Sequence, residues 1–204
     1  MGGMSMLSEE RKQEIFDQAK KVNDISEEYQ LIHACFAVQK IINEHINGLF
    51  QNKFEELRQC LLKEDLDSDG VAQVLQKKQE LETENRRKRI NISIRYIESL
   101  TGFNATTTRV GTYKNSFIIS LPKELEHIRS DKGAFDYDKM KKLRKLMAHE
   151  LGHILLHTDY INEDGVVDED GNKEEESNYF ADTVLELRRE RNRNFYSDKN
   201  YEKM

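Results

Sequence analysis

The stretch that decides the fold is MAHELGHILLH, residues 147–157. It contains His-Glu-x-x-His, and on a helix this spacing places His149 and His153 one turn apart, where both imidazoles can bind one zinc ion. Glu150 then lies where its carboxylate can accept a proton from metal-bound water. The flanking residues are apolar and predict a buried helix that holds its ligands still: Leu146, Met147, Leu151, Ile154 and Leu155.

The alternative interpretation of this stretch is a solvent-exposed amphipathic helix with incidental histidines. It explains poorly why three of the six histidines in the chain lie within nine residues. Gly152 also lets another backbone approach the helix closely. Two of the other histidines, His33 and His45, lie twelve residues apart in a helical region and are interpreted as structural or surface residues. The sequence therefore favours a metal site.

A catalytic zinc site keeps three protein ligands and one open position for water. His157 is one candidate for the third ligand, but three imidazoles in a row over two helical turns span about 12 Å, too far for one metal. A carboxylate from a second, crossing helix is the better source. Residues 174–176 are all Glu and begin the next predicted helix. Glu176 lies one turn before Phe180 on the apolar face and is expected to point inward, whereas its two neighbours would face water at the helix N-terminus.

The composition indicates one or at most two domains with long, solvated helices. The chain has 204 residues, 34% charged against 37% hydrophobic, with one Pro and no Trp. A net charge of −6 argues against a protein that binds nucleic acid directly, although basic runs occur at 86–95 and 188–193. No apolar run reaches about 18 residues, so no membrane span is expected. Cys35 and Cys60 are interpreted as reduced packing residues of a cytosolic protein.

The periodicity predicts an α+β, mostly helical chain. A helical region of unknown role is expected over residues 1–100 and a catalytic domain over 101–204. The elements are helices over 8–24 (with Ser8 as N-cap), 26–62 and 71–101, a β-hairpin of 106–113 and 116–121, a helix over 136–157, an acidic loop over 159–176 and a helix over 174–191. Alternating apolar residues at 90–96 leave a strand open as an alternative there, and Asn47-Gly48 leaves a break in the second helix open.

A second motif, Asp65 to Gly70, begins like a calcium-binding EF-hand loop. The twelfth position should carry a bidentate Glu but is Gln76, and a neutral amide does not supply two carboxylate oxygens. We therefore interpret the segment as an acidic turn between helices.

Residues 144–157, followed by EESNYFA at 175–181, resemble the ImmA/IrrE family of bacterial and phage zinc metallopeptidases. Their pattern is an Ala-His-Glu-Leu-Gly-His-x-x-x-His helix and then a Glu-(Ala)-Asn-x-Phe-Ala helix, after a β-prone segment like 117–121. The resemblance covers about residues 105–190. It implies a zincin-like core with a small antiparallel sheet, with His149, His153 and Glu176 as zinc ligands and Glu150 as general base.

Two departures from the family pattern bear on the last helix. Ser177 replaces the usual Ala, a small change. The apolar run ending in Pro that usually follows Phe-Ala is here 182–187 without Pro, so the helix is expected to run on. Residues 1–100 fall outside the resemblance.

The function expected from these residues is that of a cytoplasmic zinc-dependent endopeptidase with a protein substrate. The resemblance implies that this substrate is a DNA-binding repressor of a mobile element or stress regulon. The candidates for stabilising the oxyanion are His157, Tyr160 and Tyr179, by proximity in sequence only. The alternative is a non-catalytic zinc-binding regulatory module. Glu150 favours the enzyme, because a structural zinc site needs no base, whereas a fourth protein ligand would favour the module. The oligomeric state stays open.

Overall fold

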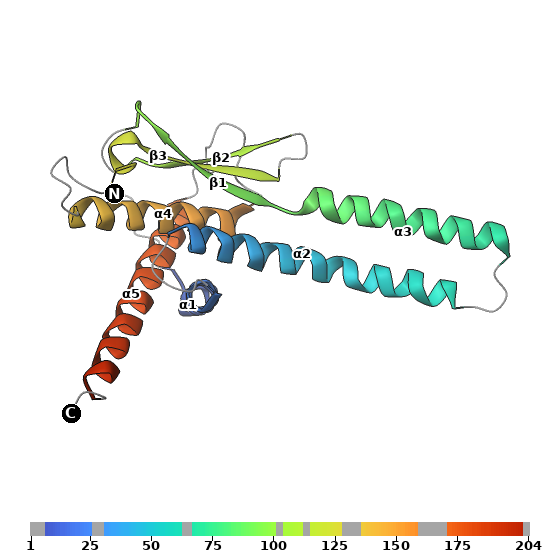
Figure 1. Cartoon of the computed structure of the whole chain (residues 1–204), viewed down its shortest axis with the longest axis horizontal. Coiled ribbons are helices and arrows are strands. Elements are labelled where there is room, and N and C mark those ends of the chain that lie inside the picture. The colour runs from blue at the N-terminus through green and yellow to red at the C-terminus, as the bar shows by residue number, and fades with distance from the viewer. Residues whose placement is uncertain are drawn as a thin grey trace.

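The computed structural model describes residues 7–25, 31–62, 67–100, 104–111, 115–127, 136–158 and 171–201. Over these ranges the chain forms α1 (Glu9–Ile25), α2 (Leu31–Leu61), α3 (Ser68–Lys88), β1 (Asn91–Ile97), β2 (Thr106–Val110), β3 (Ser116–Pro122), the short 3-10 helix η1 (Lys123–Leu125), α4 (Tyr137–His157) and α5 (Gly171–Tyr201) (Figure 1). A mostly helical chain with one small sheet confirms the expected α+β class.

Three helices begin at side chains that cap the first turn. Ser8, Asp67 and Asp136 each accept a hydrogen bond from a backbone N–H three residues later, at 3.2, 2.8 and 3.0 Å respectively. Such caps satisfy donors that have no partner within the helix. Asp67, one of the acids in the calcium-like motif, is thus the N-cap of α3, while Asp65 lies outside the described residues.

The sheet has the strand order β1-β3-β2 and is mixed. The predicted hairpin is confirmed, because β2 pairs with β3 in antiparallel register, with Thr107 opposite Ile119. The expectation of an antiparallel sheet is wrong for β1, which runs parallel to β3. The helix predicted over 71–101 is also wrong beyond Lys88, since residues 91–97 form β1. Ile92 and Ile94 alternate toward the core there, so the alternation outweighed the helical propensity of the flanking residues.

Side chains of α2 cover the outer edge of β1. Asn43 donates to the carbonyl of Ile90 at 3.1 Å and accepts from its N–H at 2.8 Å, and Gln39 accepts from the N–H of Ile92 at 3.0 Å. These bonds use backbone groups that would otherwise be open to another strand. β2 forms the opposite edge of the sheet.

The core lies around α4, which packs against α5, α2 and the sheet, while α1 packs against α5. Its largest fully buried side chains come from α1, α2, β3, η1, α4 and α5: Ile15, Val22, Val38, Phe117, Ile119, Leu121, Leu125, Met147, Leu151, Ile154 and Phe180. Outside it, α2 and α3 extend side by side away from α4 and α5 (Figure 1). α2 is continuous through Asn47-Gly48, and α5 runs past the predicted end at 191.

None of the described helices has a stretch long and apolar enough to cross a membrane. β1 belongs to the first 100 residues and pairs with β3, which lies in the predicted catalytic region. The division of the chain at residue 100 stays a prediction.

α4 and α5 lie in close contact at Gly152. A Cβ added there would lie 3.1 Å from Cδ1 of Phe180, 3.2 Å from Cα of Ser177 and 3.3 Å from its carbonyl oxygen. The expectation that Gly152 admits another backbone is confirmed. By contrast, a Cβ at Gly48 in α2 would meet nothing within 4 Å.

We predict that Gly152→Ala lowers the free energy of unfolding by about 1–3 kcal/mol, because the buried Phe180 and the α5 backbone have no room to yield. Gly48→Ala, the matched control in an open helical position, should raise it by about 0.5–1 kcal/mol through helix propensity. Urea denaturation measures both. Equal effects of the two substitutions would contradict the close contact.

Candidate metal centre

His149 and His153 lie one turn apart on α4 with their Nε2 atoms 3.0 Å apart. The rings meet edge to face, with centroids separated by 4.6 Å. Ligand atoms about 2.0–2.1 Å from a tetrahedral zinc lie roughly 3.3 Å from one another. The two nitrogens therefore have a separation that suits two ligands of one metal ion.

Glu174, from the first turns of α5, completes the group. Its Oε2 lies 3.4 Å from Nε2 of His149 and its Oε1 lies 3.2 Å from Nε2 of His153. The three residues each offer one ligand atom, and these atoms lie within 4.8 Å of one another. The side chain of Glu174 is 60% exposed. The group is thus open to solvent on one side, where a water molecule or a substrate can reach a bound ion.

The other ring nitrogens are held by α5. Nδ1 of His149 lies 3.1 Å from Oδ1 of Asn178, and Nδ1 of His153 lies 3.0 Å from Oγ of Ser177. When Nε2 binds a metal, Nδ1 carries the proton and donates to these oxygens, which fixes the ring. Glu174, Ser177 and Asn178 are spaced i, i+3, i+4 and so share one face of α5. Sequence reasoning did not assign roles to Ser177 and Asn178, although this spacing relative to Glu174 could have indicated them.

Glu176, expected from the sequence as the third ligand, is not brought to the histidine pair. Its Oε1 and Oε2 accept from Nε and Nη2 of Arg11 in α1, at 2.9 and 2.6 Å. Glu176 does point inward, as its position before Phe180 indicated, with a side chain 13% exposed. However, α5 is buried on two sides, by α4 and by α1. Positions two residues apart differ by about 200° around a helix. Glu174 therefore faces the two histidines, whereas Glu176 lies on another face, between Arg11 of α1 and His157 of α4.

Glu150 is buried beside the ligand group, 5% exposed. Thr107 of β2 donates a hydrogen bond from Oγ1 to Oε2 of Glu150 at 2.7 Å. Burial raises the pKa of Glu150 to about 7, and the hydrogen bond from Thr107 acts in the opposite direction. This carboxyl can therefore gain and lose a proton near neutral pH.

Burial also lowers the pKa of the two candidate ligands. The effect is clear for His149 despite the opposing charge of Glu174, and burial together with His149 brings the pKa of His153 to about 3. Both imidazoles are thus neutral at pH 7, which is the form that binds a metal.

Of the remaining candidates, His157 and Tyr179 belong to the described residues. His157 is buried, with its ring centroid 6.0 Å from that of His153 and its Nε2 3.4 Å from Oε2 of Glu176. The metal group found among the described residues consists of His149, His153 and Glu174 and does not include it. Tyr179 is half-buried on α5, and Tyr160 lies outside the described residues.

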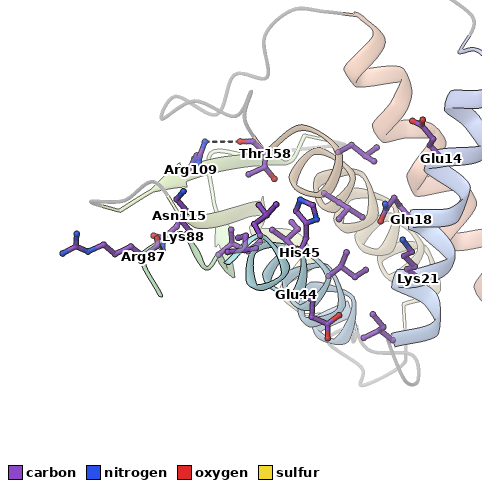
Figure 2. Close-up of a pocket in the computed structure, with 18 of the residues that line it drawn as sticks. Glu14, Gln18, Lys21, Glu44, His45, Arg87, Lys88, Arg109, Asn115 and Thr158 are labelled. Atoms are coloured by element: carbon purple, nitrogen blue, oxygen red, sulfur yellow. Dashed lines mark hydrogen bonds between the residues drawn. The ribbon is translucent and has the colours of Figure 1, made fainter. Parts of the chain in front are cut away.

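A pocket of about 1250 Å³ lies between α1, α2, the end of α4 and the sheet (Figure 2). Nη1 of Arg109 donates to the carbonyl of Thr158 at its rim, at 3.1 Å. His45, interpreted as a surface residue, is exposed and lines it. Charged and polar side chains line it together with eight apolar ones: Ile25, Ile41, Ile42, Ile46, Leu49, Ile90, Leu155 and Leu156. The pocket does not include His149 or His153, so the metal group lies outside it, where α4 meets α5.

Comparison of the chain with protein-family models, with curated proteins and with solved structures found no match. The resemblance to the ImmA/IrrE metallopeptidases therefore stays an expectation from the sequence. The geometry of the site carries the functional argument.

We predict a pH-dependent stability of the metal-free protein that depends on Glu150. Its folded pKa of about 7 exceeds the ordinary 4.5, so its stabilising contribution is complete below pH 4.5 and is lost as the pH rises through 7. Glu150→Gln stays neutral. The free energy of unfolding of the wild type should therefore fall by up to about 3 kcal/mol relative to that of this variant as the pH rises from 4.5 through 7. Denaturation at several pH values measures the difference, and a difference independent of pH would contradict the prediction.

Proposed function

We propose that the protein is a zinc-dependent endopeptidase with a zincin-like centre, in which His149, His153 and Glu174 bind the metal and Glu150 is the general base. The observation that carries the proposal is the convergence of two Nε2 atoms and one carboxylate beside a buried carboxyl group. Two imidazoles and one Glu are a ligand set found in catalytic zinc sites. A bound zinc supplies a Lewis acid that polarises the scissile carbonyl and lowers the pKa of water toward 7.

Glu150 would move the proton in this reaction. The hydrogen bond from Thr107 occupies Oε2, which leaves Oε1 to accept a proton from the attacking water and to pass it to the leaving amine. Thr107 acts by holding the carboxylate in place.

The substrate would be an extended segment of a protein. β2 carries Thr107 and has no partner on its outer side among the described strands. An extended peptide can add to such an edge through backbone hydrogen bonds, next to Glu150. The family resemblance suggests a DNA-binding repressor as the substrate protein. A cytoplasmic setting is consistent with the free thiols of Cys35 and Cys60.

A non-catalytic zinc-binding interaction module is the second candidate. The observation that favours it is the apolar surface where α2 ends and α3 begins, with Leu62 65%, Val71 36% and Leu75 51% exposed. Exposed apolar clusters suit a protein partner. A buried Glu150 next to the ligands has no use in such a module, so we rank the enzyme first.

The proposal predicts that the protein binds about one zinc per chain. His149→Ala and His153→Ala should each lose most of it, and Glu174→Ala should weaken zinc affinity at least about 10-fold. Glu175→Ala is the matched control, because its carboxylate is outside the ligand group. Elemental analysis and competition with a chelator give these values. Full zinc content in both histidine variants would place the metal elsewhere.

The two candidate functions, endopeptidase and interaction module, predict different effects of Glu150→Gln. This variant keeps the zinc ligands, and loss of a general base typically slows a reaction about 10²–10⁴-fold. We expect it to bind the protein substrate but not to cut it. Proteome-wide comparison of cleaved peptides between wild type and Glu150→Gln identifies the substrate and tests the prediction together. If wild type and Glu150→Gln yield the same cleaved peptides, the interaction module replaces the enzyme.

A further inference from the structure

The N-terminal helix α1 reaches the first turns of α5 through one bidentate ion pair. Nε and Nη2 of Arg11 bind the two carboxylate oxygens of Glu176 at 2.9 and 2.6 Å. The side chains are 35% and 13% exposed, so the pair is partly shielded from water. A planar guanidinium bound to both oxygens fixes direction as well as distance. The pair thus holds the backbone of α5 in one orientation relative to α1.

Glu176 lies within the segment that carries the metal group. Glu174 precedes it by two residues, and Ser177 and Asn178 follow it directly and hold the histidine rings. α5 begins at Gly171, so this segment belongs to the start of a helix, where backbone N–H groups lack partners within the helix and ends fray. The position of Glu174 therefore depends on tertiary contacts made by its neighbours. The ion pair between Glu176 and Arg11 is such a contact.

The same carboxylate also contacts α4. Its Oε2 lies 3.4 Å from Nε2 of His157, which is one turn beyond His153. Glu176 thus joins α1, α4 and α5 directly behind the metal group. Glu176 is held by Arg11 and His157 and is not part of the ligand group, although it lies only two residues from Glu174.

We infer that Arg11 is a positioning residue for the metal centre: its ion pair with Glu176 orients the start of α5 so that Glu174, rather than Glu176, faces the two histidines. The inference rests on the proposed metal site. It gives the N-terminal region, which lies outside the family resemblance, a direct role in that site.

The test is zinc affinity at neutral pH, measured by chelator competition for wild type, Arg11→Met, Glu176→Gln and the double variant. We expect each single variant to bind zinc about 10-fold more weakly, within the range for residues that orient ligands. The double variant should bind zinc no more weakly than the weaker-binding single variant, because the two substitutions remove the same interaction. Arg11→Lys, which keeps the charge but not the planar fork, should restore only part of the affinity.

Two controls separate positioning from a general loss of stability. Glu14 also accepts from Arg11, through Nη1 at 2.8 Å, but its side chain is 66% exposed and away from the metal group. Glu14→Gln should leave zinc affinity unchanged. Ile15→Val removes a methylene group from the fully buried face of α1 and should lower stability, again without loss of zinc affinity. The visible spectrum of the cobalt-substituted protein should change in Arg11→Met and stay unchanged in Ile15→Val.

Three outcomes would overturn the inference. Wild-type zinc affinity in both Arg11→Met and Glu176→Gln would remove Arg11 from the site while leaving the proposed function intact. Loss of zinc in Glu176→Gln with retained or tighter binding in Arg11→Met would make Glu176 itself a ligand. A wild-type protein that binds no zinc would overturn the proposed function, and the inference with it.

Discussion

The close contact of α4 with α5 at Gly152 is the constraint on which the metal centre depends. A side chain at this position would meet Phe180 and the backbone of Ser177. Without a side chain there, the two backbones approach until Ser177 and Asn178 reach the histidine rings and Glu174 reaches their outer nitrogens. One glycine on α4 thus sets the distance, and one face of α5 supplies both a ligand and the two residues that orient the others.

This arrangement requires ionisable groups to be buried. Glu150, His153 and His157 are all nearly inaccessible to water. Burial favours the neutral forms, so it raises the pKa of the carboxyl and lowers those of the imidazoles. A divalent cation would reverse the balance at Glu150 by favouring its ionised form. Metal binding and folding should therefore be coupled in this protein, because each ligand is positioned by packing that the unfolded chain lacks.

The sequence was sufficient to predict those features that depend on the spacing of residues close together in the chain. The His-Glu-x-x-His helix, the hairpin of β2 and β3 and the inward direction of Glu176 follow from spacing and residue type. The third member of the metal group was not predicted from the sequence, which indicated Glu176 in place of Glu174. That prediction assumed a single apolar stripe on α5, whereas α1 and α4 bury two of its sides. Arg11 is 165 residues from Glu176 in the chain, and nothing in the local pattern links them. β1 was ambiguous for a different reason: its alternating isoleucines follow a helical run directly.

We propose that His149, His153 and Glu174 together bind one zinc ion beside Glu150. This proposal can be tested with a crystal structure of the zinc-loaded protein in which the metal is located by anomalous scattering. We expect an ion about 2.0–2.1 Å from Nε2 of both histidines and about 2.0–2.2 Å from a carboxylate oxygen of Glu174, with a fourth position open to solvent. An ion bound by Glu176 in place of Glu174, or one enclosed by four protein ligands, would contradict it.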